Sequence, residues 1–380
     1  MNKSRSIYLD YAAATPIDPD ILNQMDQIYL NHFYNPSEIY QESLKAKNIL
    51  EQSRYDVAHI LEVKASEIIF VGGGTEANNL AISGIMQNFK GSNLLVSAIE
   101  HDSILKPAEQ YNHKIIPVNN QGIIEIDKLE KLIDQKTVLI SVILANNEIG
   151  VIQDLRLISG LINKILSKRL KNGNNLPLYL HTDACQAVNY LNLKPASLGV
   201  DLMTLNGSKI YGPKQSGALY VKNNTKIKAL ILGGGQENNL RSGSENLANI
   251  YGFCLAIKKA HQIKEEESRR TIQIRDYLIR QLSLNPRIKI NGSLTKRIAN
   301  NINFRIDGVD NEWLILKLDQ QGIMVASGSA CNAAKEELSH VLKAINLSDD
   351  EVRNSIRITL GRKTTLEDIK KLLKILNKLI

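Results

Sequence analysis

The chain has 380 residues, of which 43% are hydrophobic and 23% are charged, a composition typical of a globular protein large enough for two domains. Its net charge of +8 comes from basic residues mixed with acidic ones, and no basic run is interleaved with aromatic residues, so we expect no direct nucleic-acid binding. No run of about 18 apolar residues is present, so we expect no membrane span.

The cysteines and the first residues together indicate a compartment. Cys185, Cys254 and Cys331 do not make a disulfide framework. The N-terminal sequence MNKSRSIYLDYAAATP has no apolar segment of the kind found in secretory signals. We therefore expect a cytoplasmic protein with reduced thiols, and we assign no metal site.

Apolar runs alternate with helical patterns over the first two thirds of the chain. Residues 6–16 read as a short strand and a loop, and residues 18–62 read as helices interrupted at an Asn-Pro turn, where Ser37 is predicted to cap the next helix. Further strands are predicted at residues 66–71, 93–98, 114–118, 138–144 and 176–186. The alternation predicts an α/β protein with a mostly parallel sheet.

A glycine-rich turn follows the strand at 66–71. Gly72-Gly73-Gly74-Thr75 opens the helix that comes next. Free backbone amides at a helix N-terminus, with a Thr hydroxyl beside them, form an anion site that most often holds phosphate. The turn fits neither the dinucleotide fingerprint nor the Walker motif, and a plain strand-to-helix connection is the alternative reading.

Lys209 follows another apolar run and lies in a tight turn, Asn206-Gly207-Ser208, before Gly212-Pro213. Partial burial would lower the pKa of this lysine and suit its amine to Schiff-base chemistry. The alternative is an ordinary surface lysine.

Polar side chains follow successive strands of the predicted sheet. They are Thr75, His101, Asn147, Asp183 and Lys209. Ligands collect at the carboxyl ends of parallel strands. A buried Asp183 would need a cationic partner, which a structural Lys or Arg or a protonated pyridine nitrogen could supply. A phosphate turn, a ring to stack, an acid and a lysine at one edge match pyridoxal phosphate (PLP).

The rest of the chain is predicted to form a smaller α/β domain. A long charged helix reaches about residue 282, and strands at 287–291 and 299–304 alternate with helices at 311–320 and 366–379. We expect a large cofactor-binding domain over 16–262 and a small domain made of 1–15 and 263–380. Cys331 lies among small and polar residues, ASGSACNAA, which predicts an exposed loop with a reactive thiol, whereas Cys185 reads as structural.

Motifs in this order resemble one known family over nearly the whole chain. They are YLDYAAATP, YNPSE, GGGTEANNLA, EH, NNEIGVIQDL, HTDACQ, GSKIYGPK, GGGQE, RSGS, SGSAC and SIRITLGR. Together they look like cysteine desulfurases of the NifS/IscS type, which have PLP-dependent transferase fold type I. The SGSAC motif resembles the class with the longer catalytic loop.

The resemblance implies a role for each matching residue. Lys209 would hold PLP as a Schiff base, His101 would stack on its ring, and Asp183 would face the ring nitrogen. Cys331 would take the sulfur of L-cysteine as a persulfide and release alanine. The remaining roles are phosphate binding by Gly74, Thr75, Asn206 and Ser208, contact with the ring oxygen by Asn147 and Gln186, contact with the neighbouring subunit's phosphate by Ser244, and substrate-carboxylate binding by Arg357 with Asn35.

Two departures from the family pattern affect what is implied. Asn206-Gly207-Ser208 replaces the usual Ser-x-His, which predicts lower cofactor affinity, and Gly74 replaces a commoner Ala, which we expect to matter little. The sequence also ends soon after SIRITLGR, where other members carry a longer tail that docks the iron–sulfur scaffold.

The implied protein is a homodimer that passes sulfur to an acceptor protein for iron–sulfur cluster assembly, tRNA thiolation or DNA sulfur modification. A PLP-dependent lyase or aminotransferase of the same fold, or a catalytically weak protein that docks sulfur acceptors, stays open as an alternative. The sequence leaves the acceptor, and the preference for cysteine over selenocysteine, undetermined.

Overall fold

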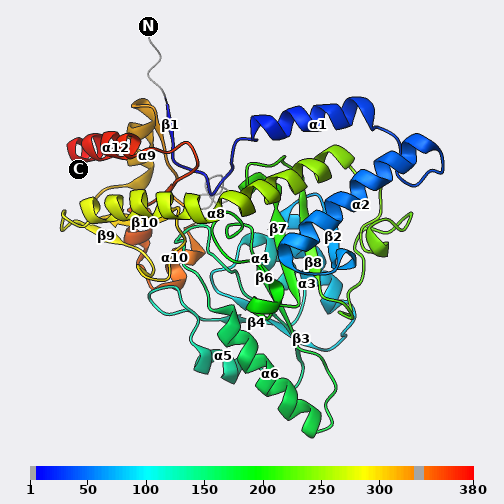
Figure 1. Cartoon of the computed structure of the whole chain (residues 1–380). Coiled ribbons are helices and arrows are strands. Elements are labelled where there is room, and N and C mark those ends of the chain that lie inside the picture. Colours follow the sequence, from blue (N-terminus) through cyan, green and yellow to red (C-terminus); the bar gives the residue numbers. More distant parts are fainter. Residues whose placement is uncertain (1–5, 329–337) are drawn as a thin grey trace.

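The computed structural model describes residues 6–328 and 338–380, with a large sheet at the centre of the molecule (Figure 1). Its seven strands are β2 (Ile68–Val71), β3 (Asn93–Ser97), β4 (His113–Ile116), β5 (Thr137–Ser141), β6 (Tyr179–Asp183), β7 (Leu202–Asn206) and β8 (Gly217–Val221). They are ordered β2-β8-β7-β6-β5-β3-β4. Strand β8 is antiparallel to both neighbours and the other pairs are parallel. The prediction of a mostly parallel seven-stranded sheet is confirmed.

Helices cover both faces of this sheet. In β2, Ile68 and Phe70 pack into the core on one face, whereas Ile69 and Val71 pack on the other, because successive side chains of a strand point to opposite faces. The first face is covered by α1 (Pro19–Asn31), α2 (Gln41–Leu61), α6 (Leu155–Lys171) and α8 (Leu247–Leu282), and the second by α3 (Gly74–Met86) and α4 (Asp102–Ala108). Burial on both faces explains the apolar runs in the middle of β3 and β5.

The two ends of the chain meet in a second group of elements. Strand β10 (Asn301–Ile306) lies between β12 (Ser355–Thr359) and β9 (Ile288–Ile290), and β1 (Ile7–Tyr8) pairs with β11 (Ile323–Met324). These strands share a separate hydrophobic core with the C-terminal half of α8 and with α9 (Asn311–Gln320) and α12 (Leu366–Leu379). Shorter helices are α5 (Ile126–Leu132), α7 (Pro195–Leu198), α10 (His340–Ala344) and α11 (Asp349–Arg353). The division at residues 15/16 and 262/263 stays a prediction.

The helix caps in the structure confirm the predicted bounds of two helices and show that one predicted cap is wrong. Asp310 and Thr365 accept hydrogen bonds from amides in the first turns of α9 and α12, so these helices have the predicted bounds. Ser37 does not cap α2, which begins at Gln41 after Tyr40. The amide of Ser37 instead donates to Asn35 Oδ1, which extends the turn.

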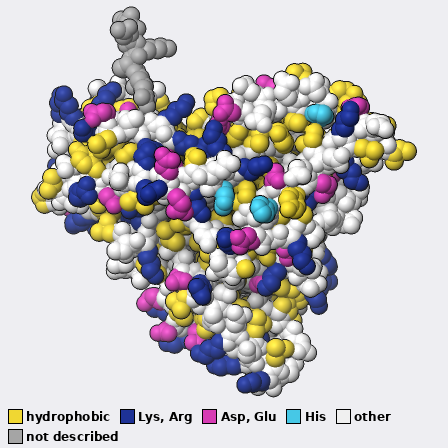
Figure 2. Space-filling view, viewed as in Figure 1, with side chains coloured by type: hydrophobic (Ala, Val, Ile, Leu, Met, Phe, Trp, Pro, Cys, Tyr) yellow, Lys and Arg dark blue, Asp and Glu magenta, His cyan; other side chains and the backbone are white. Residues whose placement is uncertain are grey.

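Within the described residues, no helix is long and apolar enough to cross a membrane. On the face seen in Figure 2, Lys and Arg side chains alternate with acidic ones.

Candidate active site

A cavity of about 240 Å³ opens at the carboxyl ends of the parallel strands. Nine of the predicted site residues line it: Gly74, Thr75, His101, Asn147, Asp183, Gln186, Asn206, Lys209 and Arg357. Eight of these nine come from strand ends and from the segments that follow them. Arg357 comes from β12, and Ala12 and Ala13 close the cavity from the N-terminal segment. The structure therefore gathers most of the predicted site in one place.

The glycine-rich turn, Gly72-Gly73-Gly74-Thr75, leads from β2 into a helix as predicted. Gly73 has φ 136°, a value that L side chains rarely adopt, and α3 begins at Gly74. The space beside Gly74 is tighter than we expected, because a Cβ there would lie 2.9 Å from Cys185 Sγ and 3.2 Å from Asn206 Nδ2. Glycine at position 74 is therefore matched to these two side chains.

Asn206 fixes the turn before the lysine. Its Oδ1 accepts hydrogen bonds from the amide and the hydroxyl of Ser208, both at 3.1 Å. The Nδ2 group, a donor only, is thereby turned toward Gly74. Ser208 does not line the cavity, and its carbonyl accepts from Thr15.

The amine of Lys209 reaches the N-terminal segment. Nζ donates to the carbonyls of Ala12 at 2.9 Å and Ala13 at 2.5 Å. Burial is the largest effect and lowers the pKa of this amine below its usual value, and the charge of Arg357 lowers it further, against smaller opposing effects of Asp183 and Asp10. The expectation of a partly buried lysine with a lowered pKa is met.

Asp183 is buried and held by two donors. Oδ2 accepts from Asn78 Nδ2 at 2.8 Å, and Oδ1 accepts from the Cys185 amide at 2.9 Å. Asn78 also donates to Ser103 Oγ, which is hydrogen-bonded to His101 Nδ1 at 2.8 Å. A continuous chain of hydrogen bonds thus joins the acid to the ring predicted to stack on the cofactor.

Two further titratable groups lie beside Asp183. Burial raises the pKa of the Cys185 thiol well above its usual value, and the charge of Asp183 raises it further. The same two effects raise the pKa of Glu100, whose Oε1 accepts from the Ile143 amide at 2.5 Å. Cys185 is therefore a protonated thiol in the cavity wall, poorly suited to act as a nucleophile.

Arg357 is 1% exposed and links the two halves of the chain. Its Nη2 donates to Asp10 Oδ1 at 2.6 Å, and its Nη1 donates to the Asn147 carbonyl at 3.1 Å. Its Nε is buried with no hydrogen-bond partner among the described residues. A buried guanidinium with donors to spare is suited to bind a carboxylate.

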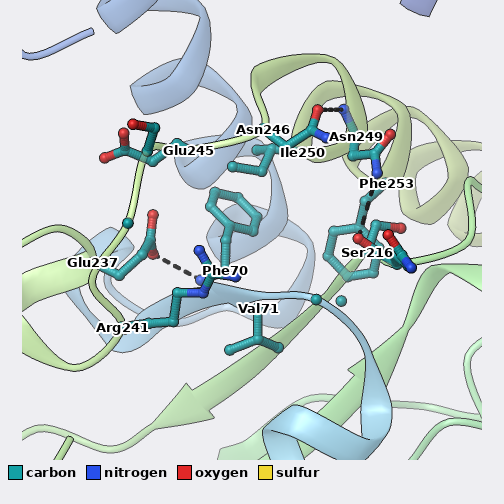
Figure 3. Close-up of a pocket in the computed structure, with 15 residues that line it drawn as sticks. Phe70, Val71, Ser216, Glu237, Arg241, Glu245, Asn246, Asn249, Ile250 and Phe253 are labelled. Atoms are coloured by element: carbon teal, nitrogen blue, oxygen red, sulfur yellow. Dashed lines mark hydrogen bonds between the residues drawn. The ribbon is translucent and has the colours of Figure 1, made fainter. Parts of the chain in front are cut away.

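Besides Ser208, two predicted residues lie elsewhere, and a third is not described. Asn35 is exposed in the turn between α1 and α2 and does not line the cavity beside Arg357. Ser244 lines a separate cavity of about 100 Å³, together with Phe70, Arg241 and Glu245 (Figure 3). Cys331 lies outside the described residues.

Sequence reasoning missed several residues. Asn78 lies one turn into α3 among buried apolar residues. A polar residue at a position where this helix faces the core was the signal in the sequence that could have identified it. Cys185, read as structural, lines the cavity. Asp10 carried no local signal, because its partner Arg357 is 347 residues away.

Taken together, the sheet order, the second group of elements and a cavity at the strand ends define a PLP fold type I enzyme. The sequence model of the class-V aminotransferases matches residues 7–372, and the chain belongs to that family. Within the family it belongs with the cysteine desulfurases, as the resemblance predicted.

Individual relatives support this placement over the full length. The chain is 39% identical to the cysteine desulfurase IscS of Dictyoglomus turgidum, over 99% of this chain and 95% of that protein. It matches the structure of a NifS-like protein with a TM-score of 0.90 and 27% identity, over 99% of both chains. It also matches SspA in complex with cysteine, with a TM-score of 0.81 and 30% identity, over 95% of this chain and all of SspA.

Proposed function

We propose that this protein uses PLP to remove the sulfur atom from L-cysteine, giving L-alanine and a persulfide on Cys331. One observation carries the proposal: an amine, a buried acid and a buried guanidinium, on Lys209, Asp183 and Arg357, converge on one cavity. The family and the full-length similarity to cysteine desulfurases support the same conclusion.

The residues present fit the cofactor. The amides at the start of α3, the Thr75 hydroxyl and the Asn206 Nδ2 group offer hydrogen-bond donors to a phosphate, with Ser208 orienting Asn206. The Asp183 carboxylate would hold a proton on the ring nitrogen, because an adjacent anion favours the charged form of a base. His101 would stack on the ring, and Asn147 and Gln186 would lie near its hydroxyl. When bound, PLP supplies an electron sink for bonds at the substrate's α-carbon.

Three side chains of the protein would carry out the remaining steps of the reaction. Lys209, with its lowered pKa, would hold the cofactor's aldehyde carbon and afterwards move protons at the substrate carbon. Arg357 would orient the substrate carboxylate. The Cys331 thiolate would attack the substrate sulfur, so that an S–S bond forms while the carbon–sulfur bond breaks and its electron pair stays with the carbon that becomes alanine's methyl group. The protonated state of Cys185 leaves Cys331 as the better nucleophile.

The assembly and its setting belong to the same proposal. Ser244 lines a cavity other than the one that contains Lys209, and the proposal includes a homodimer in which Ser244 reaches the neighbouring subunit's phosphate. Cys331 would pass its sulfur to an acceptor protein. Cys185 and Cys254 are both free thiols, in keeping with the reducing cytoplasm.

Mass spectrometry of the protein mixed with L-cysteine, without reductant, tests the proposal. One added sulfur on the peptide that holds Cys331, and none in Cys331→Ala, would support it. A protein that shows the cofactor's colour but gains no sulfur would point to a lyase or aminotransferase. A colourless protein that gains no sulfur would point to a docking role.

A further inference from the structure

The carboxylate of Glu148 is buried beside the cavity. Glu148 is 1% exposed and follows Asn147 in the loop after β5. Its backbone is fixed on both sides, because its amide donates to Asn146 Oδ1 at 2.8 Å and its carbonyl accepts from Asn301 and Asn303, each at 3.2 Å. The direction of the side chain is therefore well determined, although the proposed reaction gives it no role.

This carboxylate lies beside two residues, Gly328 and Ser339, that are on opposite sides of the undescribed residues 329–337. Oε2 accepts a hydrogen bond from Ser339 Oγ at 2.5 Å. The same oxygen lies 3.2 Å from where a Cβ on Gly328 would be. Gly328 directly precedes residues 329–337, which include Cys331, and Ser339 follows them after Leu338. One carboxylate oxygen therefore binds the flank after this segment and lies beside the flank before it.

Further contacts tie these flanks to the cavity wall. Before Gly328, Ala326 exchanges two backbone hydrogen bonds with Arg357, at 2.6 and 3.2 Å. After Ser339, His340 Nε2 is hydrogen-bonded at 2.8 Å to the carbonyl of Glu100, the residue before His101. The two flanks also lie next to each other, because a Cβ on Gly328 would be 3.9 Å from Ser339 Cβ.

We infer that Glu148 is a positioning residue for Cys331: its carboxylate binds Ser339, in the flank after the Cys331 segment, to the loop that carries Asn147, at a point beside Gly328 in the flank before it. The inference rests on the proposed function, because it takes Cys331 as the group that receives the sulfur. Misplacing a reacting group by about 1 Å can slow a reaction about a hundredfold, so loss of this anchor would slow the sulfur transfer while leaving substrate binding intact.

Single-turnover persulfide formation on Cys331, followed by quenched mass spectrometry, tests the inference. In Glu148→Ala we expect the rate to fall at least about tenfold. The affinity for L-cysteine, followed by the change in the cofactor's absorbance, should change less than about twofold, because Glu148 is not among the described residues that line the cavity proposed for cofactor and substrate. Glu148→Gln keeps an acceptor oxygen for Ser339 and should retain most of the rate.

Ser339→Ala removes the donor of the same hydrogen bond and should slow persulfide formation in the same way. Because Ser339 also caps α10, the matched control is Ser348→Ala, which removes the cap of the equally short α11 away from Glu148. Wild-type rates in both Glu148→Ala and Ser339→Ala would overturn the inference. A parallel loss of rate and substrate affinity would show that Glu148 is merely structural and would overturn it too. If the wild-type protein itself forms no persulfide, the proposed function fails first and the inference falls with it.

Discussion

Arg357 Nη2 donates to Asp10 Oδ1 at 2.6 Å, and this ion pair joins the N-terminal segment to β12 at the wall of the cavity. Arg357 is 1% exposed, and Asp10 keeps its charge compensated when no substrate is bound. Because Asp10 and the Asn147 carbonyl use two of the five guanidinium hydrogens, donors remain for a substrate carboxylate.

Replacing Arg357 by Lys should weaken substrate binding. Lysine keeps the positive charge beside Asp10 but loses the planar fork that binds a carboxylate with two hydrogen bonds. Hydrogen bonds to charged groups contribute about 1.5–3 kcal/mol, so the KM for L-cysteine should rise about 10- to 100-fold. Steady-state alanine production measures this. Arg305→Lys, in a neighbouring strand and paired with Glu351, is the control, and an unchanged KM in Arg357→Lys would remove Arg357 from the substrate site.

Replacing Lys209 by Ala should abolish covalent attachment of the cofactor. Borohydride treatment of the wild-type protein should fix reduced cofactor to the peptide that contains Lys209, because its buried amine has a lowered pKa and is the group proposed to form the Schiff base. Peptide mass spectrometry is the measurement. Lys214→Ala, an exposed lysine five positions on, should label like the wild type. Labelling that persists in Lys209→Ala would show that another lysine holds the cofactor.

The titration of His181 should make the fold less stable in acid. His181 is fully buried in β6 between Ser141 Oγ at 2.9 Å and Thr204 Oγ1 at 3.1 Å. Burial lowers its pKa to about 4, against the opposing charge of Asp183. The unfolded chain takes up the proton near its ordinary pKa of about 6.5, so between these values the unfolded state binds more protons and stability falls as the pH falls.

This effect is measured by the free energy of unfolding in urea at about pH 7 and about pH 5. The wild-type protein should lose about 2 kcal/mol more between these two pH values than His181→Gln, whose amide can replace the hydrogen bonds but cannot take up a proton. The exposed His261→Gln is the control and should follow the wild type. An equal loss in His181→Gln and the wild type would assign the acid sensitivity to other groups.

Prediction from the sequence worked best for residues at strand ends, because their place along the chain determines where they lie in the sheet. Asp183 and Lys209 follow apolar strands of a parallel sheet, so their meeting at one edge could be predicted before any contact was known. The Asn78 link between Asp183 and Ser103 could not, because it depends on how α3 is rotated against the sheet. Asp10–Arg357 and Glu148–Ser339 join residues 347 and 191 positions apart, and no local pattern encodes such pairs.

Gly74 shows how a substitution that looks minor in sequence is constrained in space. In Gly74→Ala, the new Cβ would lie 2.9 Å from Cys185 Sγ, closer than packed atoms allow, and overpacking of this kind costs about 1–3 kcal/mol. Because the same residue begins α3, whose first amides are proposed to bind the phosphate, we expect the dissociation constant of PLP to rise about tenfold or more. Titration of the apoprotein with PLP, followed by absorbance, measures it.

Removing the atom that causes the clash should reverse the defect. Cys185→Ala in the Gly74→Ala background removes Sγ and should restore most of the affinity, leaving only the 3.2 Å approach to Asn206 Nδ2. Gly160→Ala in α6, where a Cβ meets nothing within 4 Å, is the control and should bind PLP like the wild type. Two results would contradict this prediction: normal PLP affinity in Gly74→Ala, or no recovery of PLP affinity when Cys185→Ala is added. Either one would show that the Cys185 thiol does not exclude a Cβ at position 74.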